Sequence, residues 1–447
     1  MKLRSFVAAS LLTWSGASSA CHVLGCSAAS PAVPNPALDA GQADLDAAGS
    51  GRPKPPPGVR ARVAAEISTY AGSGATDSRD GPAESASFFE PLAVVADSAG
   101  NVYVGTPRRI RKIGPDRVVS TLKDGTSGLV HPWGLALDGN GTLFVADGYA
   151  NLIASVGPDN TVRVLAGSKK GFADGVGNAA QFAYPKGLAL DLQGNVIVAD
   201  LENGRLRKLA PSGEVTTLAG GGARWEDGPV ASALLNKPSS VAVGPNDELV
   251  FAESGSRRVR TLIRGSIVTI AGNPSLSGAT DGLGGAATFA DPVDMVVDRA
   301  GNSFVADRTN QAVRWVRADG SVATIAGGSR GFADGSALVA KFDMPSALAL
   351  DSSGNLFIAD FGNARIRKMS IKRGAIEVGW DSAGGTFAYT ASASTPGGPV
   401  AGSCSTTESL TCTIGGLTSG ALYSVTVVAT SPAGASAPSS PVELAAF

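Results

Sequence analysis

The sequence is poor in histidine, the residue on which many zinc sites and general bases depend. Only two are present, His22 and His131. A zinc centre held by several histidines therefore cannot be built. Charge of one sign is also lacking, because 37 Lys and Arg residues nearly cancel 38 Asp and Glu residues. A balanced chain gives no electrostatic reason to expect nucleic acid as a partner.

Long hydrophobic runs are absent except near the N-terminus. There, Lys2 and Arg4 precede an apolar stretch from Phe6 to Trp14, and small residues follow. This order predicts an export signal over residues 1–25, and the apolar stretch is too short to span a bilayer. Cleavage after Ala20 is one interpretation, which gives a secreted protein. The other is lipidation of Cys26, because the residues before it resemble a bacterial lipobox, and this gives a lipoprotein of the cell envelope.

Residues 26–63 are rich in Pro, Ala, Gly and Ser and have no apolar periodicity. Such a composition predicts a disordered tether, because it cannot bury a core. Cleavage before Cys26 would also remove His22. A lipid on Cys26 is the only membrane attachment that the sequence suggests.

A repeat occupies most of the remaining chain. Its units start at marker prolines, which are Pro91, Pro132, Pro185, Pro238, Pro292 and Pro345. The step between them is roughly 53 residues, apart from a shorter first step, and each unit contains short strand-like runs. In the third unit these runs are 187–191, 195–200, 205–209 and 214–219. Four short strands per repeat, with 58 glycines to supply tight turns, predict an all-β fold with a six-bladed β-propeller.

The last unit lacks its outer strand, and a spare copy lies before the first unit. Glu66 to Gly72 matches Glu214 to Gly220, whereas nothing equivalent follows Met369. We therefore expect the N-terminal strand to complete the sixth blade and close the propeller over residues 64–371. Closure would remove an open sheet edge.

The motifs of these units resemble NHL repeats. The third unit reads VTTLAG, AxFxxP, GLALD, GNVIVAD and NGRLRKL. The resemblance implies a six-bladed propeller that serves as a binding platform, with enzymes as a minority among its relatives. The second unit departs from the pattern, since it has Leu129 in place of the phenylalanine and Ala154 in place of an arginine. In the first unit we expect Gly105 at the position of a recurrent acid.

Residues 372–447 have a different pattern and are predicted to form a small β-sandwich. Runs 376–380, 387–393 and 424–430 alternate as strands. With Trp380 on an early strand and Tyr423 as a tyrosine corner, the segment resembles a fibronectin type III domain. Cys404 and Cys412 are expected to form a disulfide, because exported proteins favour them.

Two sets of acids recur along the chain, each at its own position in the repeat. Asp80, Asp174, Asp227, Asp281 and Asp334 precede glycines, and Asp147, Asp200, Glu253, Asp307 and Asp360 end a strand. One interpretation is a cation site, for which Asp200, Glu253 and Asp307 are candidate ligands and Ca²⁺ the candidate ion. The other is structural, because Asp-Gly is common in turns and arginines recur nearby.

Residues that interrupt the repeat are better candidates for ligand binding. These candidates are His131, Trp133, Lys169, Lys170, Phe172, Arg224, Trp225 and Glu226. Exposed Trp and Arg are enriched at binding hot spots, although partly buried loop residues would give the same pattern.

Two functions therefore remain open. The first is an exported non-catalytic binding or scaffold protein, with a protein or glycan ligand, no nucleic acid and no required cofactor. The alternative is a propeller enzyme of lactonase or lyase type that depends on a divalent cation. No catalytic residue is assigned.

Overall fold

The computed structural model describes residues 52–222 and 224–447, all of which belong to one compact unit. The predicted export signal, Cys26 and most of the predicted tether lie outside these residues. The described chain is built from strands and four single-turn 3₁₀ helices. None of its helices is long and apolar enough to cross a membrane.

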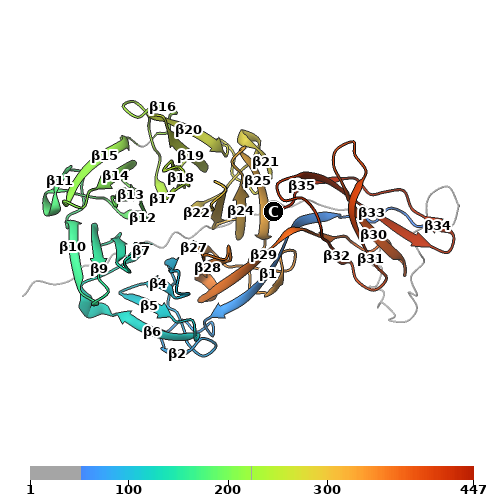
Figure 1. Ribbon diagram of the computed structural model, residues 1–447, viewed down its shortest axis with the longest axis horizontal. Helices are drawn as coiled ribbons and strands as arrows, with labels where there is room; N and C mark the ends of the chain where they lie inside the picture. The colour runs from blue at the N-terminus through green and yellow to red at the C-terminus, as the bar shows by residue number, and fades with distance from the viewer. Residues whose placement is uncertain (1–51, 223) are drawn as a thin grey trace, which may run out of the picture. The chain divides into compact units, whose positions relative to one another are not determined.

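Antiparallel sheets of four to six strands repeat along the chain (Figure 1). The first contains β2 (Gly81–Pro82), β3 (Ala93–Ala96), β4 (Val102–Thr106), β5 (Arg109–Ile113) and β6 (Val118–Lys123). The second contains β7 (Pro132–Leu137), β8 (Leu143–Asp147), β9 (Leu152–Val156) and β10 (Val162–Gly167). The third contains β11 (Gly175–Val176), β12 (Pro185–Leu190), β13 (Val196–Asp200), β14 (Arg205–Leu209) and β15 (Glu214–Gly220).

Three further sheets follow the same order. The fourth contains β16 (Gly228–Pro229), β17 (Pro238–Val243), β18 (Leu249–Glu253), β19 (Arg258–Ile263) and β20 (Ser266–Ala271). The fifth contains β21 (Gly282–Leu283), β22 (Pro292–Val297), β23 (Ser303–Asp307), β24 (Ala312–Val316) and β25 (Ser321–Gly327). The sixth contains β26 (Gly335–Ser336), β27 (Pro345–Leu350), β28 (Leu356–Asp360), β29 (Arg365–Gly379) and β1 (Arg60–Ala71).

A short turn joins the two strands that follow each marker proline, such as β12 and β13, and sets their register. In the third repeat, Asp191 Oδ1 accepts hydrogen bonds from the backbone N–H groups of Gln193 and Asn195, at 3.0 and 2.7 Å. Gly194 has a φ of +79°, which favours glycine. The same Asx geometry recurs at Asp351, so the turn explains why an Asp and a Gly recur there.

The strands that start at or just after the marker prolines face a common channel. Strands β3, β7, β12, β17, β22 and β27 contact one another in that order, and β27 contacts β3. Together they line a cavity of about 430 Å³. This arrangement, visible in the left half of Figure 1, is that of a β-propeller with several blades.

Neighbouring sheets pack through the phenylalanine of the AxFxxP motif. Phe182 is fully buried and lies in a cluster that joins Ala146 and Ile153 of the second sheet to Leu188 and Val196 of the third. Phe88, Phe289 and Phe342 are buried equally, and Leu235 replaces them in the fourth repeat. Their recurrence therefore reflects packing between sheets.

Strand β1 pairs with β29, as its sequence predicts, and also extends beyond it. Ile67 lies opposite Met369 and Thr69 opposite Arg367, while Arg60 lies opposite Gly379. We expected 376–380 to begin a separate strand, but β29 runs from Arg365 to Gly379 without a break. It can do so because β1 supplies pairing along nearly its whole length. Part of the predicted tether, residues 60–63, thus belongs to a strand.

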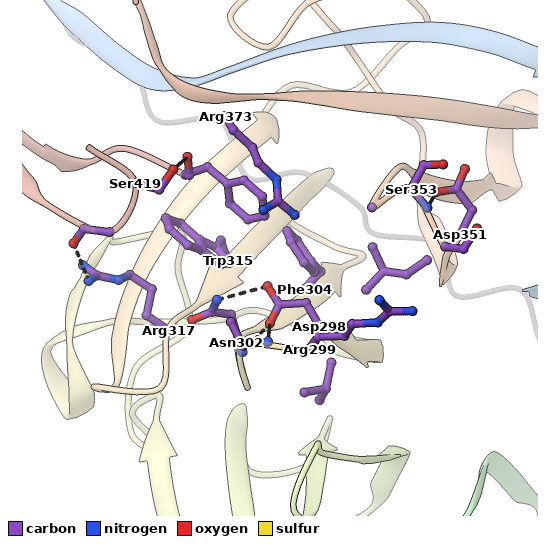
Figure 2. A pocket seen from close by; sticks show the side chains of 17 residues that line it. Asp298, Arg299, Asn302, Phe304, Trp315, Arg317, Asp351, Ser353, Arg373 and Ser419 are labelled. Atoms are coloured by element: carbon purple, nitrogen blue, oxygen red, sulfur yellow. Dashed lines mark hydrogen bonds between the residues drawn. The ribbon is translucent and has the colours of Figure 1, made fainter. Parts of the chain in front are cut away.

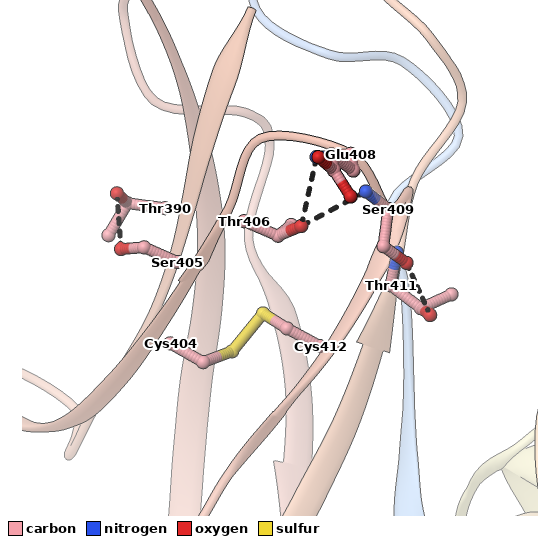
Figure 3. Close-up of a disulfide and its surroundings, with 8 residues drawn as sticks. All are labelled: Thr390, Cys404, Ser405, Thr406, Glu408, Ser409, Thr411 and Cys412. Carbon is pink, nitrogen blue, oxygen red and sulfur yellow. Dashed lines mark hydrogen bonds between the residues drawn. A yellow bond between two sulfur atoms is a disulfide. The ribbon is translucent and has the colours of Figure 1, made fainter.

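The C-terminal region adds a second group of strands, namely β30 (Ala388–Ser394), β31 (Val400–Thr406), β32 (Thr411–Ile414), β33 (Leu422–Ser431), β34 (Gly434–Ala435) and β35 (Val442–Ala445). Strand β32 pairs with β29, whereas the others form a separate sheet around β33. Trp380, Tyr389 and Tyr423 are buried between them. Cys404 of β31 and Cys412 of β32 form a disulfide that links the two sheets (Figure 3).

Candidate functional site

In four repeats, a buried arginine forms ion pairs with the two recurrent acids of that repeat. In the third repeat, the guanidinium of Arg207 is fully buried and binds Asp200 Oδ2 at 2.8 Å and Asp174 Oδ1 at 2.6 Å. It also donates to the carbonyl oxygens of Gln181 and Ala173. Arg260, Arg314 and Arg367 bind their own pairs of acids in the same way. These carboxylates therefore hold the repeat together.

The first two repeats depart from this scheme. Arg111 binds one acid of the described residues, Asp80, because the residue at the position of Asp200 is Thr106. We predicted Gly105 there, but the shorter loop places Thr106 opposite Arg109, as Asp200 lies opposite Arg205. In the second repeat, Asp147 has no arginine and accepts instead from the backbone N–H groups of Val130, His131 and Ala150.

The cation candidates Asp200, Glu253 and Asp307 are each bound to a different buried arginine. Burial raises the pKa of all three, and their hydrogen bonds and arginine partners oppose that rise. Over residues 52–222 and 224–447, no three His, Cys, Asp or Glu side chains are grouped as metal ligands. The geometry thus favours the structural interpretation of these acids.

A pocket of about 610 Å³ opens where the central channel meets the loops that follow β8, β13, β18, β23 and β28. We call it the channel mouth. Its lining includes Trp133, Lys186 and Ser346, which also line the channel below. All three directly follow a marker proline. The corresponding residues in the other repeats are Leu92, Ser239 and Val293, so this position carries five different side chains across the six repeats, with serine occurring twice.

Aromatic rings gather on one side of the channel mouth. The rings of His131 and Tyr149 lie 4.4 Å apart, and those of Trp133 and Tyr149 5.6 Å apart. Tyr184 extends the cluster, with its ring 5.4 Å from that of Tyr149. Tyr149 is 50% exposed, so a ligand can reach its ring. Clusters of exposed aromatic rings are suited to binding sugars and protein side chains.

His131 sits at the base of this cluster. Burial lowers the pKa of its imidazole, and the Asp147 carboxylate opposes that effect. Its Nδ1 atom is buried and has no hydrogen-bond partner among the described residues. The lowered pKa favours the neutral imidazole, which forms part of the aromatic surface.

Cations lie on the other side of the mouth. Lys186, Lys237, Arg257 and Arg308 line it together with two acids, Glu90 and Asp291. Arg308 is paired with Asp291 at 2.8 Å. Lys237 is exposed and stands in a left-handed backbone conformation, with a φ of +52°. The excess of positive charge favours an anionic ligand.

The surroundings of Lys186 strongly affect the pKa of its ammonium group. Its Nζ donates to the carbonyl oxygen of Val293 at 2.9 Å. Burial lowers the pKa of Lys186 to about 8, and the charge of Asp294 opposes the shift. Asp294 accepts from Ser240 Oγ at 2.6 Å and from the Leu348 N–H at 2.8 Å, and burial raises its pKa. Charged side chains thus line the channel as well as its mouth.

The structure brings only some of the predicted binding residues to this site. His131 and Trp133 line the mouth, and Lys170 lies over the Tyr184 ring at 4.6 Å while pairing with Glu202. Lys169 is exposed outside the mouth.

Phe172 and Trp225 have another role. They stack on Arg205 and Arg258, at 3.6 and 3.4 Å from ring centroid to guanidinium carbon. Phe332 stacks on Arg365 in the same way at 4.1 Å. The idea that Phe172 and Trp225 interrupt the repeat is therefore wrong, because these aromatic rings recur at one position. Neighbouring Arg224 and Glu226 are exposed on the same loop, away from the channel mouth.

Sequence reasoning missed Tyr149, Tyr184, Lys186, Lys237, Arg257 and Arg308. A signal for Lys186 was present, since the six residues after the marker prolines can be compared directly. The loop residues were harder to find, because their neighbours across the channel come from distant repeats.

Comparison with known proteins identifies the repeat. Residues 182–209 and 342–369 match the NHL repeat. The chain carries NHL repeats. They lie in the third and sixth sheets of the β-propeller, at equivalent positions from the AxFxxP phenylalanine to Leu209 of β14 and to Met369 of β29.

Several curated proteins resemble this chain. Protein SUPPRESSOR OF QUENCHING 1, chloroplastic, from Arabidopsis thaliana is 27% identical over 346 residues, which cover 60% of this chain and 32% of that protein. Teneurin-m from Drosophila melanogaster is 28% identical over 338 residues, which cover 65% of this chain and 12% of that protein. The chain thus spans about a third or less of these relatives.

A solved structure shares the fold. An auxiliary nutrient binding protein from Bacteroides ovatus superposes with a TM-score of 0.56 at 18% identity, covering 70% of this chain and 78% of that one. At this identity, the similarity establishes the β-propeller fold alone.

Proposed function

We propose that this protein is an exported, non-catalytic binding protein whose NHL propeller captures an anionic glycan or protein segment at the channel mouth. The observation that carries the proposal is the combination of an exposed aromatic cluster around Tyr149 with an excess of cations around Lys237. Rings provide contact area and lysine and arginine recognise carboxylates and other anions. These residues differ between repeats, whereas fold-supporting residues recur.

The architecture that we propose has six blades. The circular order of contacts among the channel strands supports six, and the pairing of β1 with β29 supports closure by the N-terminal strand. For the C-terminal region we propose a fibronectin type III-like sandwich. The Tyr423 hydroxyl accepts a hydrogen bond from the Thr418 N–H at 2.9 Å, which is the geometry of a tyrosine corner.

Export is the proposed route to this function. The charged and apolar N-terminal residues fit a signal, with either secretion or a lipid on Cys26 as the outcome. The Cys404–Cys412 disulfide also fits an oxidising compartment.

A lactonase or lyase that depends on a divalent cation is the alternative. Such an enzyme needs free oxygen ligands, whereas the recurrent carboxylates bind buried arginines. We therefore favour binding without catalysis.

The test is a binding screen with the full-length protein against a glycan array that includes uronate-containing oligosaccharides, and against envelope extract. For a ligand so found, we expect Tyr149→Ala and Lys237→Gln each to weaken binding, Tyr149→Ala by about 2 kcal/mol or more. Trp225→Ala is the matched control, because this ring is similarly exposed but stacks on Arg258.

The alternatives give different results. Loss of binding in Trp225→Ala with normal binding in Tyr149→Ala would move the site to the outer loops. Turnover of a lactone that stops when divalent cations are chelated would establish the enzyme instead.

A further inference from the structure

Another cavity lies away from the channel mouth. It has a volume of about 860 Å³ and opens between the turns of the fifth and sixth sheets and the C-terminal region (Figure 2). Arg299 follows β22, Trp315 belongs to β24 and Arg373 to β29, while Ser419 and Phe447 come from the C-terminal region. Figure 2 shows Arg373, Arg299, Trp315 and Phe304 around a common space.

The two acids of this cavity, Asp298 and Asp351, already accept three hydrogen bonds each. Asp298 accepts from the N–H groups of Ala300 and Asn302 and from the Asn302 amide. Asp351 accepts from Ser353 and from both nitrogens of Asn355. These carboxylates hold the two turns, so they are poor partners for the arginines.

The arginines are correspondingly free. Arg299 and Arg373 line the cavity and form no hydrogen bond or ion pair with any residue in 52–222 or 224–447. Arg373 only lies near the Phe447 ring, at 5.9 Å. Arg317, the third arginine, donates to the Gly420 carbonyl oxygen at 2.9 Å. The cavity therefore offers two guanidinium groups with unused donors.

The floor of the cavity is aromatic. Phe304 is fully buried, Trp315 is 3% exposed, and the Phe447 ring lies 5.8 and 5.1 Å from theirs. Trp315 Nε1 is buried and lacks a hydrogen-bond partner among the described residues. A surface of this kind favours an apolar body over a fully hydrated one.

We infer that this cavity is a second binding site, which takes an organic carboxylate with an apolar, preferably aromatic, body. The carboxylate would lie between Arg299 and Arg373, because guanidinium groups bind carboxylates with paired, charge-assisted hydrogen bonds. The apolar body would cover Phe447 and the edges of Phe304 and Trp315. A volume of 860 Å³ lies in the range of small-molecule sites.

The probe is 2-naphthoate, titrated into the full-length protein by calorimetry. We expect saturable binding that weakens in high salt and is much weaker for the neutral 2-naphthamide. Arg299→Gln and Arg373→Gln should each weaken binding by about tenfold or more, the usual effect of losing a hydrogen bond to a charged group. Both side chains are exposed, so the variants should fold.

Arg264→Gln is the control, because Arg264 is exposed on the β19–β20 turn and its loss changes the net charge equally. Nuclear Overhauser contacts between naphthoate and the rings of Phe447 and Trp315 would locate the ligand without any variant. No binding at millimolar naphthoate, or equal weakening by all three substitutions, would overturn the inference. Tyr149→Ala should leave naphthoate binding unchanged, so this site and the channel mouth can fail separately.

Discussion

At the scale of single residues, the buried arginines decide how the recurrent acids behave. Arg207 and Asp200 are both fully buried and bind each other at 2.8 Å. A buried pair of this kind adds little over an apolar pair, but removing one partner leaves an uncompensated charge. The loss of stability on substitution therefore depends on whether a buried charge is left without its partner.

We predict that Asp200→Ala lowers the free energy of unfolding by about 3 kcal/mol. Asp174, whose side chain is 45% exposed, would then be the one carboxylate left to Arg207. Urea denaturation measures the loss. The control is Asp138→Ala, since Asp138 holds only an exposed turn and its removal should cost much less. Equal losses for both variants would contradict the structural role of Asp200.

Lys186 gives a second prediction at this scale. Its pKa should be close to 8, because burial disfavours the ammonium form. The unfolded chain binds more protons than the folded chain between that value and the ordinary 10.5, so stability should rise with pH across this window. Below about pH 8 that gain is absent.

An NMR titration of labelled lysine side chains measures this pKa directly. Asp294→Asn should move it further down, because the Asp294 charge raises the pKa of Lys186. A value near 10.5 would show that Lys186 is open to solvent, and a rise in Asp294→Asn would contradict the charge effect of Asp294 on Lys186.

How well the sequence predicts single residues depends on whether their partners are near in the chain. The turn at Asp191 and the pairing of acids with arginines follow from local spacing. Tyr149 and Tyr184 come from neighbouring repeats, and Arg308 lies far along the chain from both. No local pattern joins these residues into one pocket.

At the scale of elements, the sequence predicts one part of strand β1 and not the other. Its similarity to β15 predicted an outer strand, and β1 pairs with β29 as expected. The sequence did not predict that both strands continue together from the propeller into the C-terminal region. Such an extension depends on two segments some 300 residues apart in the chain, as the pairing of Arg60 with Gly379 illustrates.

We predict that Ile67→Ala in β1 lowers the free energy of unfolding by about 2–5 kcal/mol. Ile67 is fully buried in the cluster that contains Phe342, Ile358 and Met369, so its loss leaves a cavity beside β29. Ser68→Ala, on the opposite face of the strand, should change stability by about 0.5 kcal/mol or less. A melting temperature of Ile67→Ala equal to that of the unaltered protein would mean that β1 does not contribute to this sheet's core.

At the scale of the whole molecule, the C-terminal region is more closely joined to the propeller than its sequence suggests. A change of pattern after Lys372 predicts an independent domain. Yet β29 crosses that point without a break, and Ala445 and Phe447 pack in the same cluster as Phe304 and Trp315. Apolar packing and a continuous strand couple the two regions energetically.

Residues 52–447 should therefore unfold in a single calorimetric transition, with equal calorimetric and van't Hoff enthalpies. Phe447→Ala tests the coupling, because it removes the ring that lies 5.1 Å from Trp315 without touching the buried cluster around Trp380 and Tyr423. This variant should lower the melting temperature of the whole protein and keep one transition. Leu422→Ala is the control, since Leu422 is 45% exposed. Two separate transitions, only one of them shifted by Phe447→Ala, would show that the propeller and the C-terminal region fold independently, in which case the cavity between them could open without unfolding either.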